Sequence, residues 1–389
     1  MTPAPIYLDN AATSFPKPEV VYEAVDSYQR RIGAAFGRGT RGADHADSLV
    51  DRCRHQLAEL IGATDHRSVA FVFNATDGLN LLLRGVLRAA DHVLTTTLEH
   101  NSVLRPLEQL RHQLPITVEH VPFDTTTGLI DEVEFEQSCR HRPPNLVVLN
   151  MASNVTGIVQ PLSDLIPIAR SVGAIVLVDA AQVAGCVPLN VESQDVDLLV
   201  AAGHKGLVGP LGTGFVYVRP SIQDRLISFR CGGTGTESES LQQPAEMPQL
   251  LESGNLNMPG IAGLNAALTW RKTSEFQNLF QRHQNQIPQL VHGLADIPNV
   301  TVYCGHSAAS GTGVVSIRIS DIEPHEVAVI LSQSFGIQCR AGLHCAPLAH
   351  RTLGTKSMGG TIRLSPGLFT TDEEIEQAVQ AVSEIAAAC

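Results

Sequence analysis

Lys205 is the residue of this chain whose setting is best suited to covalent chemistry. It follows an apolar run at residues 198–202 and stands within Gly203-His204-Lys205-Gly206, in a chain that has only four lysines beside 23 arginines. Burial and cationic neighbours lower the pKa of a lysine and expose its neutral, nucleophilic amine. The alternative is a lysine whose stem is covered at a strand end while its amine reaches solvent.

Asp179 ends a second apolar run, at residues 175–179, and Gln182 follows three residues later. A buried carboxylate needs a cationic or hydrogen-bonding partner. The pyridinium nitrogen of pyridoxal phosphate (PLP) is such a partner, and its protonation makes the ring an electron sink. An aspartate at a strand end can also cap a helix. Asp179 and Lys205, 26 residues apart at the ends of consecutive predicted strands, together favour a PLP site.

Short apolar runs alternate with amphipathic stretches in the first two thirds of the chain. They predict strands at residues 68–73, 92–96, 117–121, 146–150, 175–179, 197–201 and 214–218, with a helix at 161–172 in one of the gaps. This alternation predicts an α/β fold with a largely parallel sheet and helices on both faces. Ligands of such sheets bind beyond the carboxyl ends of the strands. The polar residues that fall just after such ends are His100, Asn154, Asp179, Gln182 and Lys205.

The pattern changes after about residue 260. Helices are predicted at residues 261–271, 274–294, 324–334 and 371–388, and strands at 313–319, at 360–364 and just before Cys345. This mixture predicts a smaller α+β domain. Residues 232–249, rich in Gly, Ser, Glu and Pro, predict a mobile loop.

Composition narrows the class of protein. A chain of 389 residues favours two domains, and a net charge of −12 argues against a nucleic-acid surface. The first residues lack a basic segment followed by an apolar one, and no run of 18 apolar residues occurs, so we expect neither a signal peptide nor a membrane span. The eight cysteines contain no C-x-x-C pair, which argues against a metal site or disulfide framework and favours the cytoplasm.

Seven ordered segments resemble those of one enzyme group, and they extend over essentially the whole chain. The chain is similar to class V aminotransferase-fold enzymes of the cysteine desulfurase and selenocysteine lyase group. The matching segments are residues 7–13, 99–101, 153–157, 178–182, 203–205 and 340–347, together with Arg363.

The resemblance implies the fold and the cofactor. It implies a PLP-dependent transferase of fold type I, with a large PLP-binding domain at residues 14–260, a small C-terminal domain at 261–389, and residues 1–13 packed on the small domain. The residues implied to hold PLP are Lys205, Ala75, Thr76, His100, Asn154, Asp179, Gln182 and His204. His100 would lie flat on the ring and move protons, while Thr76 and His204 would bind the phosphate. Taken alone, Asn74 or Thr76 is better explained as a helix cap, and His100 as a structural histidine.

The resemblance also implies a reaction. Arg363, with Arg340 and Asn154, would bind the substrate carboxylate, because guanidinium groups match carboxylates in a bidentate fork. From the residue alone, an internal salt bridge explains Arg363 equally well. Cys345 lies between Arg340, His344 and Pro347, and cationic neighbours would favour its thiolate. Lys205 would remove the Cα proton of L-cysteine, and Cys345 would take the sulfur as a persulfide and release L-alanine.

Two positions depart from the family pattern, and two rival functions remain open. Ala202 and Asn255 stand where relatives carry hydroxyl residues near the phosphate, which would weaken PLP binding by roughly 0.5–1.5 kcal/mol each. One rival is a PLP-dependent C–S or C–Se lyase (selenocysteine lyase) or aminotransferase that does not use Cys345 as sulfur carrier. The other is a PLP-free scaffold for sulfur-transfer machinery. The resemblance further implies a homodimer, a small-molecule substrate (L-cysteine or L-selenocysteine), and service to a sulfur-acceptor protein, as in iron–sulfur cluster assembly.

Overall fold

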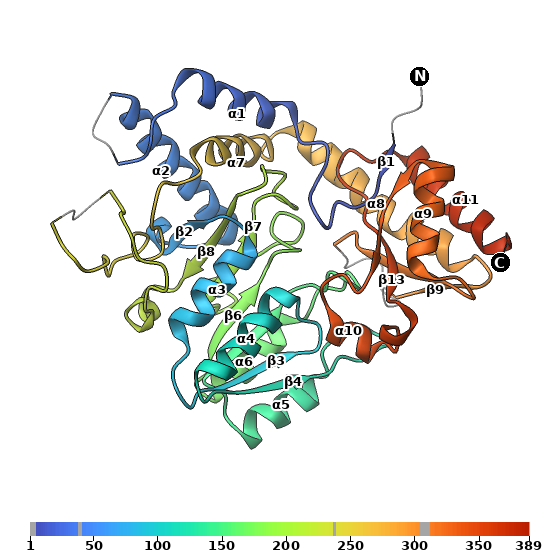
Figure 1. The fold of residues 1–389 in the computed structure, drawn as a ribbon, viewed down its shortest axis with the longest axis horizontal. Helices are drawn as coiled ribbons and strands as arrows, with labels where there is room; N and C mark the ends of the chain where they lie inside the picture. The colour runs from blue at the N-terminus through green and yellow to red at the C-terminus, as the bar shows by residue number, and fades with distance from the viewer. Residues whose placement is uncertain (1–4, 38–40, 236–238, 304–311, 389) are drawn as a thin grey trace.

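A seven-stranded sheet forms the centre of the larger lobe in the computed structural model, which describes residues 5–37, 41–235, 239–303 and 312–388 (Figure 1). The strand order is β2-β8-β7-β6-β5-β3-β4, in which β8 runs antiparallel to both neighbours and all other pairs are parallel. The strands are β2 (Val69–Val72), β3 (His92–Thr96), β4 (Thr117–Val121), β5 (Leu146–Asn150), β6 (Ile175–Asp179), β7 (Leu198–Ala202) and β8 (Gly214–Val218). The predicted mostly parallel sheet is confirmed.

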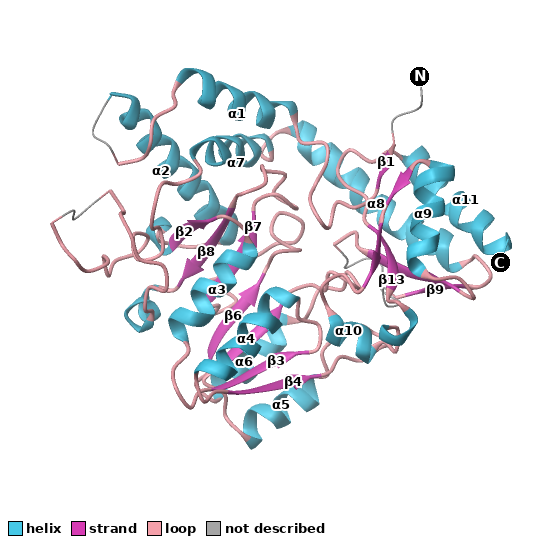
Figure 2. Cartoon of the chain, in the orientation of Figure 1, coloured by secondary structure: helices cyan, strands magenta, loops and turns pink. Residues whose placement is uncertain are grey.

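Helices cover both faces of this sheet (Figure 2). Successive side chains of a strand point to opposite faces, and β6 follows this rule: Ile175 and Leu177 join the apolar cluster of one face, while Val176 and Val178 join that of the other. The first cluster packs on α3 (Ala75–Val86) and α4 (Asn101–Gln113). The second packs on α2 (Arg41–Ile61), α5 (Glu132–His141), α6 (Leu162–Ser171) and α7 (Met258–Trp270). Burial on both faces explains why these strands read as continuous apolar runs.

The smaller lobe contains a four-stranded antiparallel sheet in the order β12-β13-β10-β9. Its strands are β9 (Val300–Val302), β10 (Val315–Ile319), β12 (Arg340–Gly342) and β13 (Thr361–Leu364). Its core packs on α8 (Ser274–Ala295), α9 (Pro324–Phe335) and α11 (Asp372–Ala388). The short helix α10 (Pro347–Thr352) lies between this lobe and the large sheet (Figure 1). An α/β lobe with a smaller α+β lobe is the fold class expected from the sequence.

The chain connects the two lobes at two places, before residue 19 and after residue 270. The N-terminal strand β1 (Ile6–Tyr7) pairs in parallel with β11 (Ile337–Gln338), and the chain then passes to α1 (Glu19–Arg31) on the large lobe. Helix α7 packs against α1 and α2, and its apolar residues through Leu268 belong to the core of the large lobe. The domain limits near residues 13 and 260 stay predictions. Residues 236–238 of the loop predicted at 232–249 lie outside the described residues, and the remainder contains no helix or strand.

Candidate active site

All eight residues expected to hold PLP line one cavity of about 480 Å³ beyond the carboxyl ends of the large sheet. They come from four strand ends and one helix start, which the fold brings to the same edge: Ala75, Thr76, His100, Asn154, Asp179, Gln182, His204 and Lys205. Ala202, one of the two departures from the family pattern, lines the same cavity. Their convergence follows from the parallel order of β7, β6, β5 and β3.

Lys205 and Asp179 lie at adjacent strand ends, where their opposite charges interact. Burial lowers the pKa of Lys205 to about 8, although the nearby Asp179 carboxylate acts in the opposite direction. Burial likewise raises the pKa of Asp179, while the Ala181 N–H, which donates to Asp179 Oδ1 at 2.9 Å, and the Lys205 charge lower it. The positive charges of Arg363 and Arg340 also lower the pKa of Lys205. The lysine amine is therefore much closer to its neutral, nucleophilic form at pH 7 than a lysine in water.

His100 is the N-cap residue of α4, and its capping fixes the form of its ring. The Ser102 N–H donates to His100 Nδ1 at 3.0 Å, so Nδ1 carries no proton. Burial, with the charges of Lys205 and Arg340, lowers the pKa of His100 to about 4. The ring is therefore neutral at pH 7, with its proton on Nε2. Ser102 Oγ also lies 2.8 Å from His100 Nδ1 and 2.7 Å from Thr76 Oγ1, which joins the starts of α4 and α3.

The start of α3 is capped as the residues alone suggested. Asn74 Oδ1 accepts from the Asp77 N–H at 2.9 Å and is the N-cap residue. Because Asn74 serves as the cap, the Thr76 hydroxyl is left on the cavity side, where it contacts Ser102 Oγ. A helix start with free N–H groups beside a hydroxyl suits an anion.

Arg363 is held from two sides, by the N-terminal segment and by the large lobe. Its Nη2 lies 2.7 Å from Asp9 Oδ1, and its Nη1 donates to the Asn154 carbonyl at 3.3 Å. The Arg363 side chain is 2% exposed. Each Nη carries two hydrogens, so one N–H on each remains for a carboxylate. The internal salt bridge that the residue alone suggested is present, and it leaves the guanidinium able to bind a substrate.

Cys345 lies in a turn of unusual backbone geometry. His344 and Cys345 have φ angles of 48° and 59°, in the left-handed region that residues other than glycine rarely adopt. Asn154 Nδ2 donates to the His344 carbonyl at 2.6 Å, and the Asn101 N–H donates to the Cys345 carbonyl at 2.6 Å. These bonds from the large lobe fix the turn and thereby the position of the thiol. Such strain is typical of functional sites.

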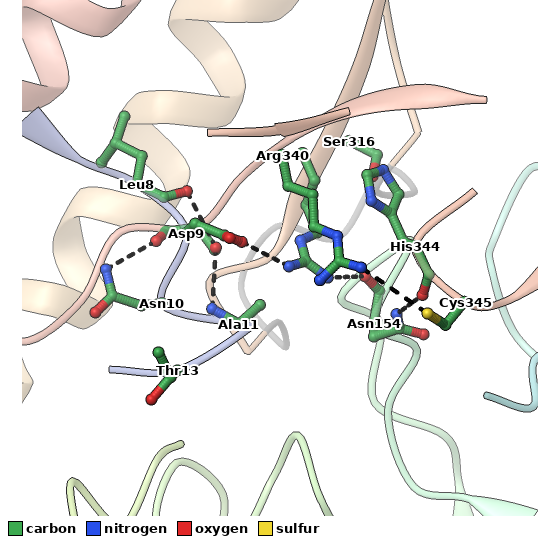
Figure 3. A network of polar contacts seen from close by, with 12 residues as sticks. Leu8, Asp9, Asn10, Ala11, Thr13, Asn154, Ser316, Arg340, His344 and Cys345 are labelled. Atoms are coloured by element: carbon green, nitrogen blue, oxygen red, sulfur yellow. Dashed lines mark hydrogen bonds and ion pairs between the residues drawn. The ribbon is translucent and has the colours of Figure 1, made fainter. Parts of the chain in front are cut away.

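The charges around Cys345 differ in part from those expected. Arg340 Nη2 lies 3.9 Å from Cys345 Sγ (Figure 3). Strand β12 places Arg340 opposite Arg363 of β13. The expectation that His344 is a cationic neighbour is wrong. Its ring is buried against Thr361, with Nε2 3.0 Å from Thr361 Oγ1, and burial lowers its pKa to about 2. The positive charge beside the thiol therefore comes from arginine.

The N-terminal segment holds the backbone at Lys205, a role that sequence reasoning did not assign to it. The His204 carbonyl accepts from the Ser14 N–H at 3.0 Å and from Lys17 Nζ at 3.0 Å, and Ser14 Oγ donates to the Lys205 carbonyl at 3.0 Å. Burial lowers the pKa of Lys17 to about 7. The sequence offered one signal for this role: Lys17 stands four residues after the matching segment at 7–13.

Three further residues of the site were given no role from the sequence. Asp9 lies within the matching N-terminal segment, and Ser102 lies two residues after His100. Glu99 is fully buried, and burial, with the nearby Asp179 charge, raises its pKa to about 8. Its Oε1 accepts from Thr96 Oγ1 at 2.9 Å. The sequence signal for Glu99 was its position directly before the candidate histidine, His100.

Gln182 lines the cavity and is also held by the N-terminal segment. Its Nε2 donates to the Ala11 carbonyl at 3.3 Å, so the amide is engaged by the N-terminal segment. Among the residues that the structure describes, no group of three or more His, Cys, Asp or Glu side chains could hold a metal ion. No helix in the described ranges is long and apolar enough to cross a membrane.

Comparison with known proteins identifies the family. The model of the class-V aminotransferase family matches residues 6–378. The chain belongs to this family. It is 32% identical to a probable cysteine desulfurase of Methanothermobacter thermautotrophicus, over 98% of this chain and 94% of that protein, and 30% identical to a probable cysteine desulfurase of Vibrio cholerae, over 97% and 92%.

Solved structures agree with this assignment. The apo structure of a cysteine desulfurase from Thermococcus onnurineus superposes with a TM-score of 0.91 at 31% identity, and covers 99% of this chain and 95% of that one. The cysteine desulfurase CsdA from Escherichia coli, in an S-sulfonic acid form, has a TM-score of 0.85 at 25% identity, over 100% and 96%. The fold expected from the resemblance is confirmed.

Proposed function

We propose that this protein is a PLP-dependent cysteine desulfurase that transfers the sulfur of L-cysteine to Cys345 and releases L-alanine. The observation that carries the proposal is the position of Cys345: it lies in a strained turn, 3.9 Å from an arginine, in the same site as Lys205. A cysteine that served only for packing would not need this backbone conformation. The names of the relatives reported above, cysteine desulfurase or probable cysteine desulfurase, support the same reaction.

The residues of the cavity fit PLP. Asn154 Oδ1 and His204 Nδ1 are buried polar atoms without a hydrogen-bond partner among the described residues, and both residues line the cavity. Buried polar atoms of native proteins normally have partners, so these two atoms favour a bound polar group. The Asp179 carboxylate would pair with the pyridine nitrogen, the start of α3 with Thr76 and His204 would hold the phosphate, and Lys205 would form the covalent link. When bound, PLP supplies an electron sink for the bonds at Cα.

Each residue then has a defined task in the proposed reaction. Arg363, with Arg340 and Asn154, binds the substrate carboxylate. Lys205, as a neutral amine, removes the Cα proton. The Cys345 thiolate attacks the substrate sulfur, so that an S–S bond forms, the Cβ–S bond breaks, and the electron pair stays with carbon. The carbon takes up a proton to become alanine, and no external oxidant or reductant is required. His100, with its proton on Nε2, donates rather than accepts at that atom.

Product analysis tests this proposal. The purified, PLP-loaded protein is incubated with L-cysteine and dithiothreitol, and alanine, sulfide, pyruvate and ammonia are quantified. Equal amounts of alanine and sulfide support the desulfurase. Pyruvate with ammonia would instead indicate a C–S lyase, and activity with L-selenocysteine alone would indicate a selenocysteine lyase. Protein that binds no PLP would favour the scaffold, and Lys205→Ala serves as the inactive control.

The proposal includes a homodimer, a cytoplasmic location and a sulfur-acceptor protein. Large apolar side chains are exposed on the large lobe, among them Phe73, Leu211 and Phe229, at 46%, 66% and 58%. Exposed apolar residues of this size mark interaction surfaces when they lie together. Size-exclusion chromatography with light scattering tests the dimer: a mass of one chain at micromolar concentration contradicts it.

A further inference from the structure

A groove on the outer face of the molecule lies beside the turn that carries Cys345. It is formed by α4 and β4 of the large lobe and by α10, which lies between the lobes (Figure 1). The groove has a volume of about 1110 Å³, which is open to solvent, and its exposed lining residues are Arg105, Glu108, Arg111, His120 and Arg351. It is far larger than a cysteine molecule requires.

The charge of the groove is opposite to that of the whole chain. Three arginines line it, Arg105, Arg111 and Arg351, but only one carboxylate, Glu108. Elsewhere acidic residues prevail, since the chain has 39 Asp and Glu and 27 Lys and Arg. Arg111 Nη1 lies 2.9 Å from Glu108 Oε2. Within the described ranges, neither Arg105 nor Arg351 forms an ion pair. Two guanidinium groups are therefore available to carboxylates of a partner.

Apolar side chains lie between the arginines. Leu107 is buried, whereas Leu104, Val118 and Leu348 are half-buried along the groove. An apolar centre with a rim of arginines is the usual composition of a protein–protein interface. Arginine is also enriched among the residues that dominate the binding energy of such interfaces.

The groove adjoins the backbone of the turn that carries Cys345. Asn101, at the start of α4, lines the groove and donates its N–H to the Cys345 carbonyl at 2.6 Å. Pro347, the first residue of α10, lines the groove two residues after Cys345. A protein bound in the groove would thus lie next to Cys345.

We propose that this groove binds the acidic face of the protein that accepts sulfur from Cys345. The inference rests on the proposed desulfurase function and adds the chemical class of the partner. A cysteine thiolate of the partner attacks the outer sulfur of the Cys345 persulfide. A new S–S bond forms on the partner, the S–S bond at Cys345 breaks, and Cys345 leaves as a thiolate with the electron pair. The hydrogen stays on the transferred sulfur, and no other reactant is needed.

The test compares two synthetic acceptor peptides of equal length, each with one cysteine, flanked by glutamates in one and by lysines in the other. The PLP-loaded protein is given L-cysteine, and persulfide formed on each peptide is measured by mass spectrometry. We expect transfer to the glutamate peptide to be about tenfold faster at low salt, and this preference to fall to about twofold or less in roughly 0.5 M salt.

Variants of the groove locate the effect. The triple variant Arg105→Gln, Arg111→Gln, Arg351→Gln should abolish the preference for the glutamate peptide. A matched control removes three exposed arginines elsewhere, Arg30→Gln, Arg52→Gln and Arg67→Gln, and should retain it. Alanine formation with dithiothreitol, a small uncharged acceptor, should be unchanged in both variants, which also shows that both fold.

Two results would overturn the inference: equal rates for the two peptides at low salt, or a preference that survives in the groove variant. Failure of the proposed function is distinguishable, because it would remove alanine formation with dithiothreitol in the unaltered protein. In that case, fluorescence anisotropy with a labelled glutamate peptide, its cysteine replaced by serine, still tests the groove. Binding that is equal in the groove variant and the control variant contradicts the inference.

Discussion

The contact between Asp9 and Arg363 allows a quantitative prediction for the variant Asp9→Asn. Arg363 is 2% exposed and Asp9 22%, with 2.7 Å between Nη2 and Oδ1. Removal of one partner of a fully buried ion pair costs about 3–5 kcal/mol. Asparagine keeps a carbonyl oxygen that can accept a neutral hydrogen bond, and Asp9 is partly solvated, so the loss is smaller. We expect the free energy of unfolding to fall by about 1–2 kcal/mol.

The assay is urea unfolding followed by circular dichroism, with Asp26→Asn as matched control. Asp26 pairs with Arg30 at 2.6 Å, but both side chains are more than half exposed, so its loss should cost less than about 0.5 kcal/mol. Because Asp9 also orients the guanidinium, Asp9→Asn should raise KM for L-cysteine by about three- to tenfold and leave kcat nearly unchanged. A variant that is as stable as Asp26→Asn and has an unchanged KM would refute this role of Asp9.

Four further predictions concern the lysine, the histidines and the thiol. In the PLP-free protein, the unfolded chain keeps the Lys205 proton between pH 8 and 10.5, whereas the folded protein has lost it. The free energy of unfolding should therefore rise with pH across this window. Lys205→Met should remove that rise, as measured by urea unfolding. The pKa of His344 is lowered in the folded protein, so the neutral ring stabilises the fold above pH 6.5. As the pH drops below 6.5, this histidine should lower the free energy of unfolding by about 1.4 kcal/mol per pH unit. His344→Asn should reduce the slope of stability against pH by that amount. Ser102→Ala removes the link between His100 and Thr76 and should weaken PLP binding about fivefold in a spectroscopic titration; unchanged affinity would show that Ser102 does not position the phosphate site. Cys345→Ser should keep the visible absorbance of bound PLP but lose sulfide release from L-cysteine by about two orders of magnitude or more, and sulfide release near the unaltered rate would contradict the persulfide step.

The large lobe could be predicted from local sequence because its strands are buried on both faces. The apolar runs at β3, β4, β5, β6 and β8 match the observed strands residue for residue, and β2 and β7 differ by one residue at their ends. The parallel order then brings the polar residues after these strands to one edge, which is why the cavity residues were found. The cap by Asn74 was also readable, since its partner Asp77 is three residues away.

The contacts that were missed depend on long-range packing. Asp9 and Arg363 are 354 residues apart, and the parallel bridge between Asp9 and Ser365 brings them together. The burial of His344 depends on Thr361 in the neighbouring strand, so the sequence of the turn alone gave the wrong charge. Opposite charges on distant segments carry no local pattern.

The central claim is that Cys345 itself carries the transferred sulfur. The direct measurement is mass spectrometry of the peptide that contains Cys345, after the PLP-loaded protein has reacted with L-cysteine without reductant and has been alkylated. We predict that this peptide gains the mass of one sulfur atom, that dithiothreitol removes it, and that no other cysteine peptide gains it to a comparable extent. Alanine formation without added sulfur on Cys345, or with the sulfur on a different cysteine, would contradict the account.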